Sequence, residues 1–219
     1  MSFMEETLNC ALPIWDTYTE TPFIQELQKG TLPIEKFKQY MIQDSIYLKH
    51  YARVYGKAMY HSTILKDIQL YYSVLCFVTD TESAVRLRYL KQFGLNDSDI
   101  EDIAPLPENQ NYINFMLGIA EEGNVSKILM AVLPCMLSYS YIFQKIAAEP
   151  KTKKSRYWDF IEDYASERYA EDCKLWGDFA EKKCTALPDP KKKELTAIFE
   201  KASLLELDFW EMASQEQRI

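Results

Sequence analysis

Apolar residues recur every three or four positions along almost the whole chain, a spacing typical of α-helices with one buried face. No stretch of useful length alternates apolar and polar residues as a half-buried strand does. The pattern predicts helices over residues 4–19, 22–29, 33–60, 64–93, 108–121, 124–148, 153–183 and 190–215. Long helices joined by short loops pack most simply as one bundle. We therefore expect an all-α fold, a single-domain helical bundle over residues 1–219.

Residues that commonly begin or end helices support these boundaries. Three prolines come just after residues suited to capping and are expected at the first helical position: Pro22, Pro33 and Pro190. Gly94 follows a long periodic stretch and is expected to end that helix. The loop 95–107 is expected to hold a one-turn helix capped by Ser98 and Glu101.

Composition narrows the class of protein. The 219 residues are 47% hydrophobic and 26% charged, which excludes a disordered chain or a fibre. A net charge of −8 argues against nucleic acid as the main partner. No basic segment precedes an apolar core at the N-terminus, and no uninterrupted apolar run approaches the roughly 20 residues that span a bilayer. An odd set of five cysteines without a CxxC pair fits a reducing compartment, so we expect a cytoplasmic protein without a membrane partner.

Two carboxylic acids interrupt apolar stripes. Asp44 lies three residues after Met41 and four before Leu48, and Tyr47 lies near enough along the helix to reach the same space. Glu206 lies likewise in the apolar stripe of the last helix. A carboxylate among apolar neighbours is costly unless it is protonated, paired or bound to a ligand. The alternatives are an Asp44 satisfied by nearby hydroxyls and a Glu206 at the exposed edge of its stripe.

A third interruption is Pro134, well inside the helix expected at 124–148. Proline removes one backbone hydrogen bond and is expected to kink the helix, freeing the carbonyl of Met130. Cys135 follows directly, and Tyr139 lies one turn further on. The combination indicates either a reactive thiol facing a pocket or an inert buried cysteine beside a packing kink.

Several chemistries have no matching motif. The sequence contains no glycine-rich phosphate loop and no GxSxG. The two histidines, His50 and His61, lie in no ExxH pair, which argues against a di-metal carboxylate site, and no His/Cys spacing suits zinc. A Cys135–His50 dyad stays open beside the simpler interpretation that His50 makes a local hydrogen bond.

Four segments, in order and with matching spacing, resemble the TenA family, known as thiaminase II or aminopyrimidine aminohydrolase. They are YMIQDSIYLKHY at 40–51, LPCMLSYSY at 133–141, YWDFIEDYAS at 157–166 and ELDFWEMA at 206–213. The resemblance covers essentially the whole chain. It implies an all-α fold like that of haem oxygenase, a homotetramer, and no metal or organic cofactor.

The resemblance also implies a function in thiamin salvage. Family members hydrolyse 4-amino-5-aminomethyl-2-methylpyrimidine to the 5-hydroxymethyl compound and also cleave thiamin. By motif, Cys135 matches the nucleophile, Glu206 the acid/base and Asp44 the carboxylate that holds the pyrimidine. Further residues match positions of the substrate pocket: Tyr47, Tyr112, Tyr139, Tyr164 and Phe209. After Cys135 the chain departs from the family pattern, because Met136 and Ser138 stand in a segment where larger aromatics and a Tyr-Tyr-Glu run are common.

The sequence leaves two other classes of function to consider. One is a non-catalytic pyrimidine-binding or regulatory protein on the same scaffold, which the loss of Cys135 or Glu206 would favour; both residues are present. The other is a haem-oxygenase-like redox protein. That class needs a proximal histidine near the start of the chain, and the first 49 residues contain none.

Overall fold

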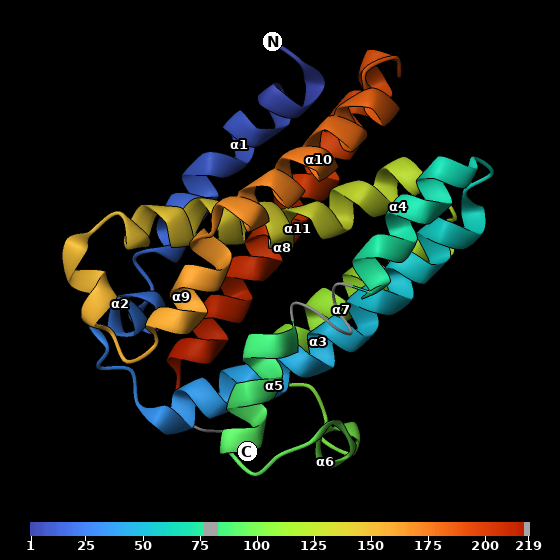
Figure 1. The fold of residues 1–219 in the computed structure, drawn as a ribbon. Coiled ribbons are helices and arrows are strands. Elements are labelled where there is room, and N and C mark those ends of the chain that lie inside the picture. The colour runs from blue at the N-terminus through green and yellow to red at the C-terminus, as the bar shows by residue number, and fades with distance from the viewer. Residues whose placement is uncertain (77–82, 217–219) are drawn as a thin grey trace. The chain divides into compact units, whose positions relative to one another are not determined.

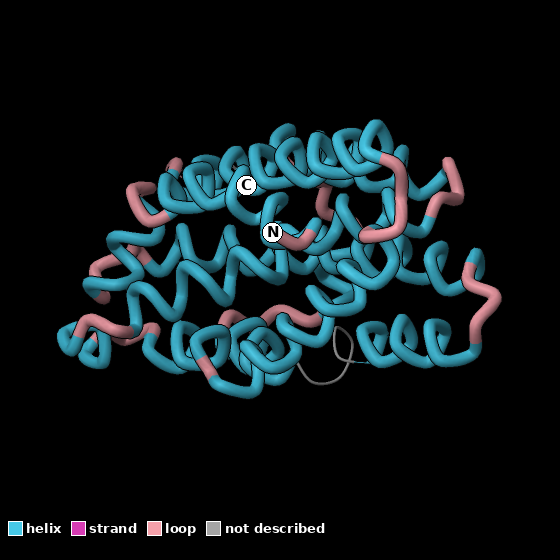
Figure 2. Tube along the Cα trace, turned by 90° about the horizontal axis from the view of Figure 1, so that it is seen from above, coloured by secondary structure: helices cyan, strands magenta, loops and turns pink. Residues whose placement is uncertain are grey.

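A computed structural model describes residues 1–76 and 83–216, and within them every regular element is a helix. Figure 1 shows these helices, and Figure 2 shows that short loops join them. The all-α fold is therefore confirmed. The chain forms two compact units, which we call the terminal unit (residues 1–32 and 129–214) and the middle unit (residues 33–128, with 215 and 216).

The middle unit is built around one long helix, α3 (Ile34–His61). Four helices contact α3: α4 (Leu65–Cys76), α5 (Ser83–Gln92), α6 (Asp97–Glu101) and α7 (Pro107–Glu121). The buried amide of Asn109 on α7 donates to the backbone carbonyl of Gln43 at 2.8 Å and to its side-chain oxygen at 3.0 Å. The Leu106 amide donates to the same Gln43 side-chain oxygen at 2.9 Å. These bonds fix the start of α7 against the middle of α3.

The terminal unit combines the first 32 residues of the chain with residues 129–214. Its helices are α1 (Phe3–Tyr18), α2 (Pro22–Lys29), α9 (Trp158–Ala165), α10 (Glu167–Cys184) and α11 (Asp189–Ser214), with the 3-10 helix η2 (Pro150–Lys154). Helix α11 packs against α1 and α2, and α10 packs against α1 and α9. The Trp15 indole donates to the Ser203 hydroxyl at 3.0 Å, which ties α1 to α11 inside the core. The chain passes from the middle to the terminal unit within α8 (Val125–Ala147).

One expected helix is divided in the structure. Of the helix expected at 64–93, the structure describes α4 and α5, and residues 77–82 lie outside the described part of the chain. The helix expected at 153–183 breaks at Ser166, whose backbone is extended with ψ 150° and whose hydroxyl accepts from the Tyr169 amide. Serine favours this capping geometry over a helix interior. The apolar spacing continues across Ser166, which is why periodicity alone predicted one helix.

Most helix ends lie close to the positions expected from the sequence, but some capping residues differ from those expected. Gly94 adopts a left-handed backbone with φ 70° just beyond α5, as expected for a helix end. Helix α6 is the one-turn helix expected in the long loop. Its cap is Asn96, paired reciprocally with Asp99, and not Ser98 and Glu101. Pro33 caps α3 from outside, so that helix begins one residue later than expected.

Helix α8 is long and apolar enough to cross a membrane by length and composition, with a mean hydropathy of 1.5 over its most apolar window. However, 67% of that window is buried within the structure. The core helix of a soluble protein passes the same test. The absence of a membrane partner stays a prediction from the sequence.

Candidate active site

In the terminal unit, aromatic rings from three helices surround Tyr139. Its ring centroid lies 4.9 Å from that of Tyr164 on α9, edge to face, and 5.1 Å from that of Trp210 on α11. Phe143, one turn further along α8, lies 5.2 Å from Tyr164. Tyr139 and Tyr164 are 4% and 7% exposed. The structure thus brings two of the predicted pocket tyrosines into direct contact.

Cys135 lies one turn before Tyr139 on α8 and is half-buried, whereas the preceding Pro134 is buried. Among the described cysteines it carries a thiol outside any disulfide, as do Cys10, Cys173 and Cys184. The Ser138 hydroxyl donates to the Cys135 carbonyl at 3.3 Å, a local bond typical of a serine inside a helix. Cys10 is exposed, and Cys173 and Cys184 are buried, so Cys135 has an intermediate position between the two extremes.

Glu206 is buried, not at the edge of its stripe. It is 2% exposed on α11, and the predicted pocket residue Phe209, three positions on, is also 2% exposed. Their neighbours Ala202 and Trp210 are fully buried. Desolvation on this scale makes the charge state of the carboxyl depend strongly on its surroundings.

Tyr18 joins this group, although no sequence pattern singled it out. The Tyr18 hydroxyl donates to the Ser203 carbonyl at 2.5 Å, one turn before Glu206 on α11. Burial raises the pKa of Tyr18 well above its ordinary value, and the negative charge of Glu206 raises it further, with smaller effects from Cys135 and Asp208. Tyr18 is therefore within electrostatic reach of both predicted catalytic residues. In the sequence, a tyrosine in the apolar stripe of α1 cannot be told from a core residue, because no neighbouring residue marks it as functional.

The middle unit holds the other three predicted residues. Asp44 is 7% exposed, Tyr47 3% and Tyr112 1%. The Tyr47 and Tyr112 rings, from α3 and α7, have centroids 4.9 Å apart. Tyr47 also lies 5.6 Å from Tyr51, so a row of tyrosines lines the buried face of α3 beside Asp44. The structure thus brings Tyr47 and Tyr112 into contact, and their assignment to a substrate pocket stays a prediction.

Burial raises the pKa of Asp44 to about 7, and the positive charge of Arg86 opposes that rise. Arg86 reaches α3 from α5, where its Nη1 donates to the Ser45 hydroxyl at 2.7 Å. Ser45 in turn donates to the Met41 carbonyl at 2.7 Å. Arg86 thus acts on a predicted site residue, and sequence reasoning missed it because an arginine on a helix gives no local signal of its partner.

His50 makes the local bond that the sequence favoured. Its Nδ1 lies 2.8 Å from Nη1 of Arg53, three residues on. Burial lowers the pKa of His50, and the nearby charges of Arg53 and Lys49 lower it further, so the ring accepts from the guanidinium. Within residues 1–76 and 83–216, no group of three or more His, Cys, Asp or Glu side chains is arranged to hold a metal ion.

Comparison with known proteins decides the family. The profile of the TENA/THI-4/PQQC family matches residues 9–216. The chain belongs to this family. The aminopyrimidine aminohydrolase of Halalkalibacterium halodurans is 29% identical over 99% of this chain and 97% of that protein. The aminopyrimidine aminohydrolase of Bacillus subtilis is 27% identical over 99% of this chain and 92% of that protein.

Similar solved structures identify the fold. A TenA homologue from P. horikoshii OT3 has a TM-score of 0.83 and 28% identity, covering 97% of this chain and 98% of that one. A domain with a heme oxygenase-like fold from Shewanella denitrificans has a TM-score of 0.67 at 17% identity, covering 95% and 90%. The resemblance to TenA is confirmed, and the TENA/THI-4/PQQC chain has a haem-oxygenase-like fold.

Proposed function

We propose that this protein is a hydrolase of thiamin salvage that converts 4-amino-5-aminomethyl-2-methylpyrimidine to the 5-hydroxymethyl compound and also cleaves thiamin. Relatives named aminopyrimidine aminohydrolase cover nearly the whole chain. The single observation that carries the proposal is that a half-buried thiol, Cys135, and a buried carboxyl, Glu206, both lie within electrostatic reach of Tyr18, whose pKa their negative charges help to raise. This pair supplies the nucleophile and the proton carrier that the reaction needs.

Direct displacement at the substrate is difficult because the leaving amine hangs from a methylene on an aromatic ring. In the proposed mechanism the Cys135 thiolate adds to a ring carbon while Glu206 protonates a ring nitrogen. The electron-rich ring then expels the protonated amine from the methylene as ammonia. Water adds to the methylene and gives up a proton to that ammonia, which leaves as ammonium. Departure of the thiolate, with return of the proton to Glu206, restores the aromatic ring. Covalent catalysis thus divides one hard step into easier ones, and one carboxyl moves the proton both ways.

Recognition of the substrate is assigned to Asp44. The 4-aminopyrimidine edge presents a ring-nitrogen acceptor next to an amino donor, which a carboxyl matches with two hydrogen bonds if one proton is shared. A pKa of about 7 supports this role, because Asp44 then holds or releases that proton near neutral pH. Tyr47, Tyr112, Tyr139, Tyr164 and Phe209 are assigned as faces for the ring, and the two tyrosine pairs described above support those assignments.

The test of the nucleophile is Cys135→Ser, with Cys10→Ser as the matched control at an exposed thiol. We expect Cys135→Ser to remove most turnover of the aminopyrimidine and of thiamin while still binding the hydroxymethylpyrimidine product. A serine hydroxyl is a far weaker nucleophile than a thiolate at neutral pH. If Cys135→Ser retains near wild-type turnover, the mechanism is wrong. Product binding without turnover in the wild-type protein would instead support a non-catalytic pyrimidine-binding protein.

Steady-state kinetics identify the preferred substrate. The aminopyrimidine, its formylated relative and thiamin are compared under the same conditions. The highest kcat/KM is expected for the aminopyrimidine, since that is the compound for which the relatives are named. If kcat/KM for thiamin is tenfold or more above that for the aminopyrimidine, the protein is primarily a thiaminase.

We also propose a cytoplasmic homotetramer that uses no metal or organic cofactor. Exposed apolar side chains of the middle unit, Leu65 at 67% and Tyr72 at 60%, support self-association. Sedimentation should give a species of about four times 25.7 kDa at micromolar concentration. A single species of 25.7 kDa contradicts the tetramer without affecting the proposed reaction.

A further inference from the structure

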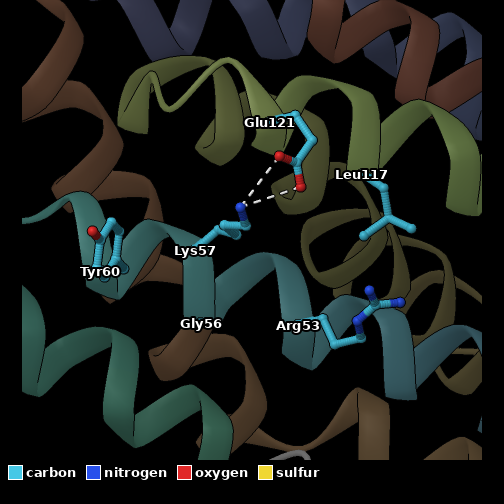
Figure 3. Close-up of a pocket in the computed structure, with 6 residues that line it drawn as sticks. All are labelled: Arg53, Gly56, Lys57, Tyr60, Leu117 and Glu121. Carbon is cyan, nitrogen blue, oxygen red and sulfur yellow. Dashed lines mark hydrogen bonds and ion pairs between the residues drawn. The ribbon is translucent and has the colours of Figure 1, made fainter.

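A hollow of about 450 Å³ opens on the middle unit, away from every residue assigned to the reaction. It is lined by Arg53, Gly56, Lys57 and Tyr60 on α3 and by Leu117 and Glu121 on α7 (Figure 3). At 100° per residue, Arg53 lies roughly 180° round α3 from Asp44. The hollow therefore faces outward, opposite the row of buried tyrosines. Its volume is within the range of small-molecule pockets.

The charges that line the hollow favour an anion. Arg53 and Lys57 lie one helical turn apart and supply two positive charges against the single carboxylate of Glu121. Lys57 Nζ lies 3.2 Å from Oε1 of Glu121 and donates to Oε2 at 3.3 Å. These side chains are 44% and 70% exposed, so the pair is weak and can open or share its donors with a ligand. The hollow keeps one positive charge even when the pair is closed, in a chain with net charge −8.

Arg53 is held ready for a planar anionic group. Its Nη1 donates to the Nδ1 of His50 at 2.8 Å, and a histidine ring carries no negative charge, so this bond orients the guanidinium without offsetting its positive charge. A guanidinium anchored at one nitrogen still offers other N–H donors in a fixed fork that suits a carboxylate or phosphate. In Figure 3, Lys57 lies between Arg53 and Tyr60 along α3.

The remaining lining suits the body of an organic ligand. Tyr60 is 81% exposed and presents a ring face, and Leu117 adds an apolar side chain. Gly56 lies in the interior of α3, where glycine is disfavoured. A Cβ added there would meet no atom within 4 Å, so close packing does not require glycine. What glycine does at this position is keep the floor of the hollow open.

We propose that this hollow is a second binding site, for a small organic anion that carries a carboxylate or phosphate group on a flat apolar body. The charged end lies between Arg53 and Lys57, and the apolar body extends from there along α3 against the ring of Tyr60. Binding is electrostatic at one end and apolar at the other, so a neutral compound of the same shape binds poorly.

The test uses benzoate and phenyl phosphate as probes, with benzamide as the neutral analogue. Binding is followed through the methyl NMR signals of Leu117 in the full-length protein, assigned by comparison with Leu117→Ile. Saturable shifts are expected with both anions and not with benzamide. Equal shifts with benzamide, or no saturation with either anion, would overturn the proposal.

Variants separate the two sources of charge. Arg53→Gln should weaken binding of both anions by about tenfold or more, because a charge-assisted hydrogen bond is lost. Glu121→Gln releases Lys57 and removes a negative charge, so it should tighten phenyl phosphate more than benzoate. Unchanged affinity for both anions in Glu121→Gln would contradict the electrostatic part of the proposal. Gly56→Leu should abolish binding by filling the hollow.

Controls keep the result specific. Lys66→Gln removes an exposed positive charge of α4 that does not line the hollow, and it should leave both affinities unchanged. Circular dichroism confirms that each variant is folded. Turnover of the aminopyrimidine without added anion should survive in Arg53→Gln, so failure of this site and failure of the proposed reaction are distinguishable. Unchanged anion affinity in folded Arg53→Gln and Gly56→Leu proteins rejects the site.

Discussion

Asp44 in the middle unit and Glu206 in the terminal unit are both buried carboxyls, but the groups that interact with them differ. Both carboxyls lie in the apolar stripe of a long helix, 7% and 2% exposed. Asp44 faces a cation, Arg86, which offsets part of the cost of burial. Glu206 lies in a region where its own charge acts on a phenol, Tyr18, and raises that phenol's pKa.

The neighbours of the two groups differ as well. Around Glu206, Trp15 and Tyr18 both donate to Ser203, so hydrogen bonds from α1 hold this part of α11 in place. Beside Asp44, the tilted rings of Tyr47 and Tyr112 pack against each other, and Arg86 donates to the adjacent Ser45. A rigid surrounding suits a group that must deliver a proton to a fixed atom. A carboxyl with a pKa near neutral suits a group that shares a proton with its ligand.

The largest effect should come from Glu206→Gln, which keeps the size of the side chain and removes proton exchange. We expect kcat to fall by about 10²–10⁴-fold, with a smaller change in product affinity. The pH profile of kcat should also lose one limb. If KM rises while kcat is nearly unchanged, Glu206 only binds, and the contrast with Asp44 disappears.

Asp44→Asn should mainly weaken ligand binding, whereas Glu206→Gln mainly lowers kcat. An amide nitrogen replaces an acceptor oxygen opposite the amino group of the ligand, a mismatch that costs on the order of 1–3 kcal/mol. Calorimetry with the hydroxymethylpyrimidine product should therefore show about tenfold weaker affinity or more. Unchanged affinity would leave Asp44 as a structural residue.

The same substitution should alter stability with pH. The pKa of Asp44 is raised from 3.8 to about 7 on folding, so the native state holds an extra proton between those values. Its stabilising contribution is complete below about pH 4 and is lost as the pH rises to about 7. Urea unfolding without ligand should show that the free energy of unfolding of Asp44→Asn, relative to that of the wild type, increases by up to about 4 kcal/mol from pH 4 to pH 8. A constant difference across this range contradicts the shift.

Arg86→Gln sharpens the comparison by removing the cation that opposes the rise in the pKa of Asp44. Without that charge the pKa of Asp44 should rise further, so the pH at which product affinity declines should move upward. Affinity at pH 7 should change by less than about tenfold, as expected for one partly exposed charge. Arg86→Lys, which keeps the charge, should leave the pH dependence close to that of the wild type.

The smallest effect is expected for Tyr18→Phe. Its raised pKa keeps the hydroxyl protonated at working pH, so it donates to Ser203 and does not exchange protons. Loss of that bond should lower the free energy of unfolding by about 0.5–1.5 kcal/mol, with a shift in kcat of only a few-fold. A loss of kcat as large as that of Glu206→Gln would pass the proton-transfer role to Tyr18.

Much of the fold was determined by the sequence itself. Helical periodicity is a local property, so α1, α3, α7, α8 and α11 could be placed to within a few residues, and Asp44 and Glu206 could be placed inside buried stripes. Gly94 could be identified as a helix end because its left-handed backbone is a local preference of glycine. The pocket tyrosines depended on resemblance, since a tyrosine in a stripe is equally suited to a core.

Only the tertiary structure decided which groups act on these carboxyls. Arg86 reaches Ser45 from 41 residues away, and Tyr18 reaches Ser203 from 185 residues away. It also decided that α9 and α10 separate at Ser166 although the apolar spacing continues. The physical reason is that a stripe records which face of a helix is buried, whereas the partner of a buried charge depends on contacts between distant segments that leave no local pattern.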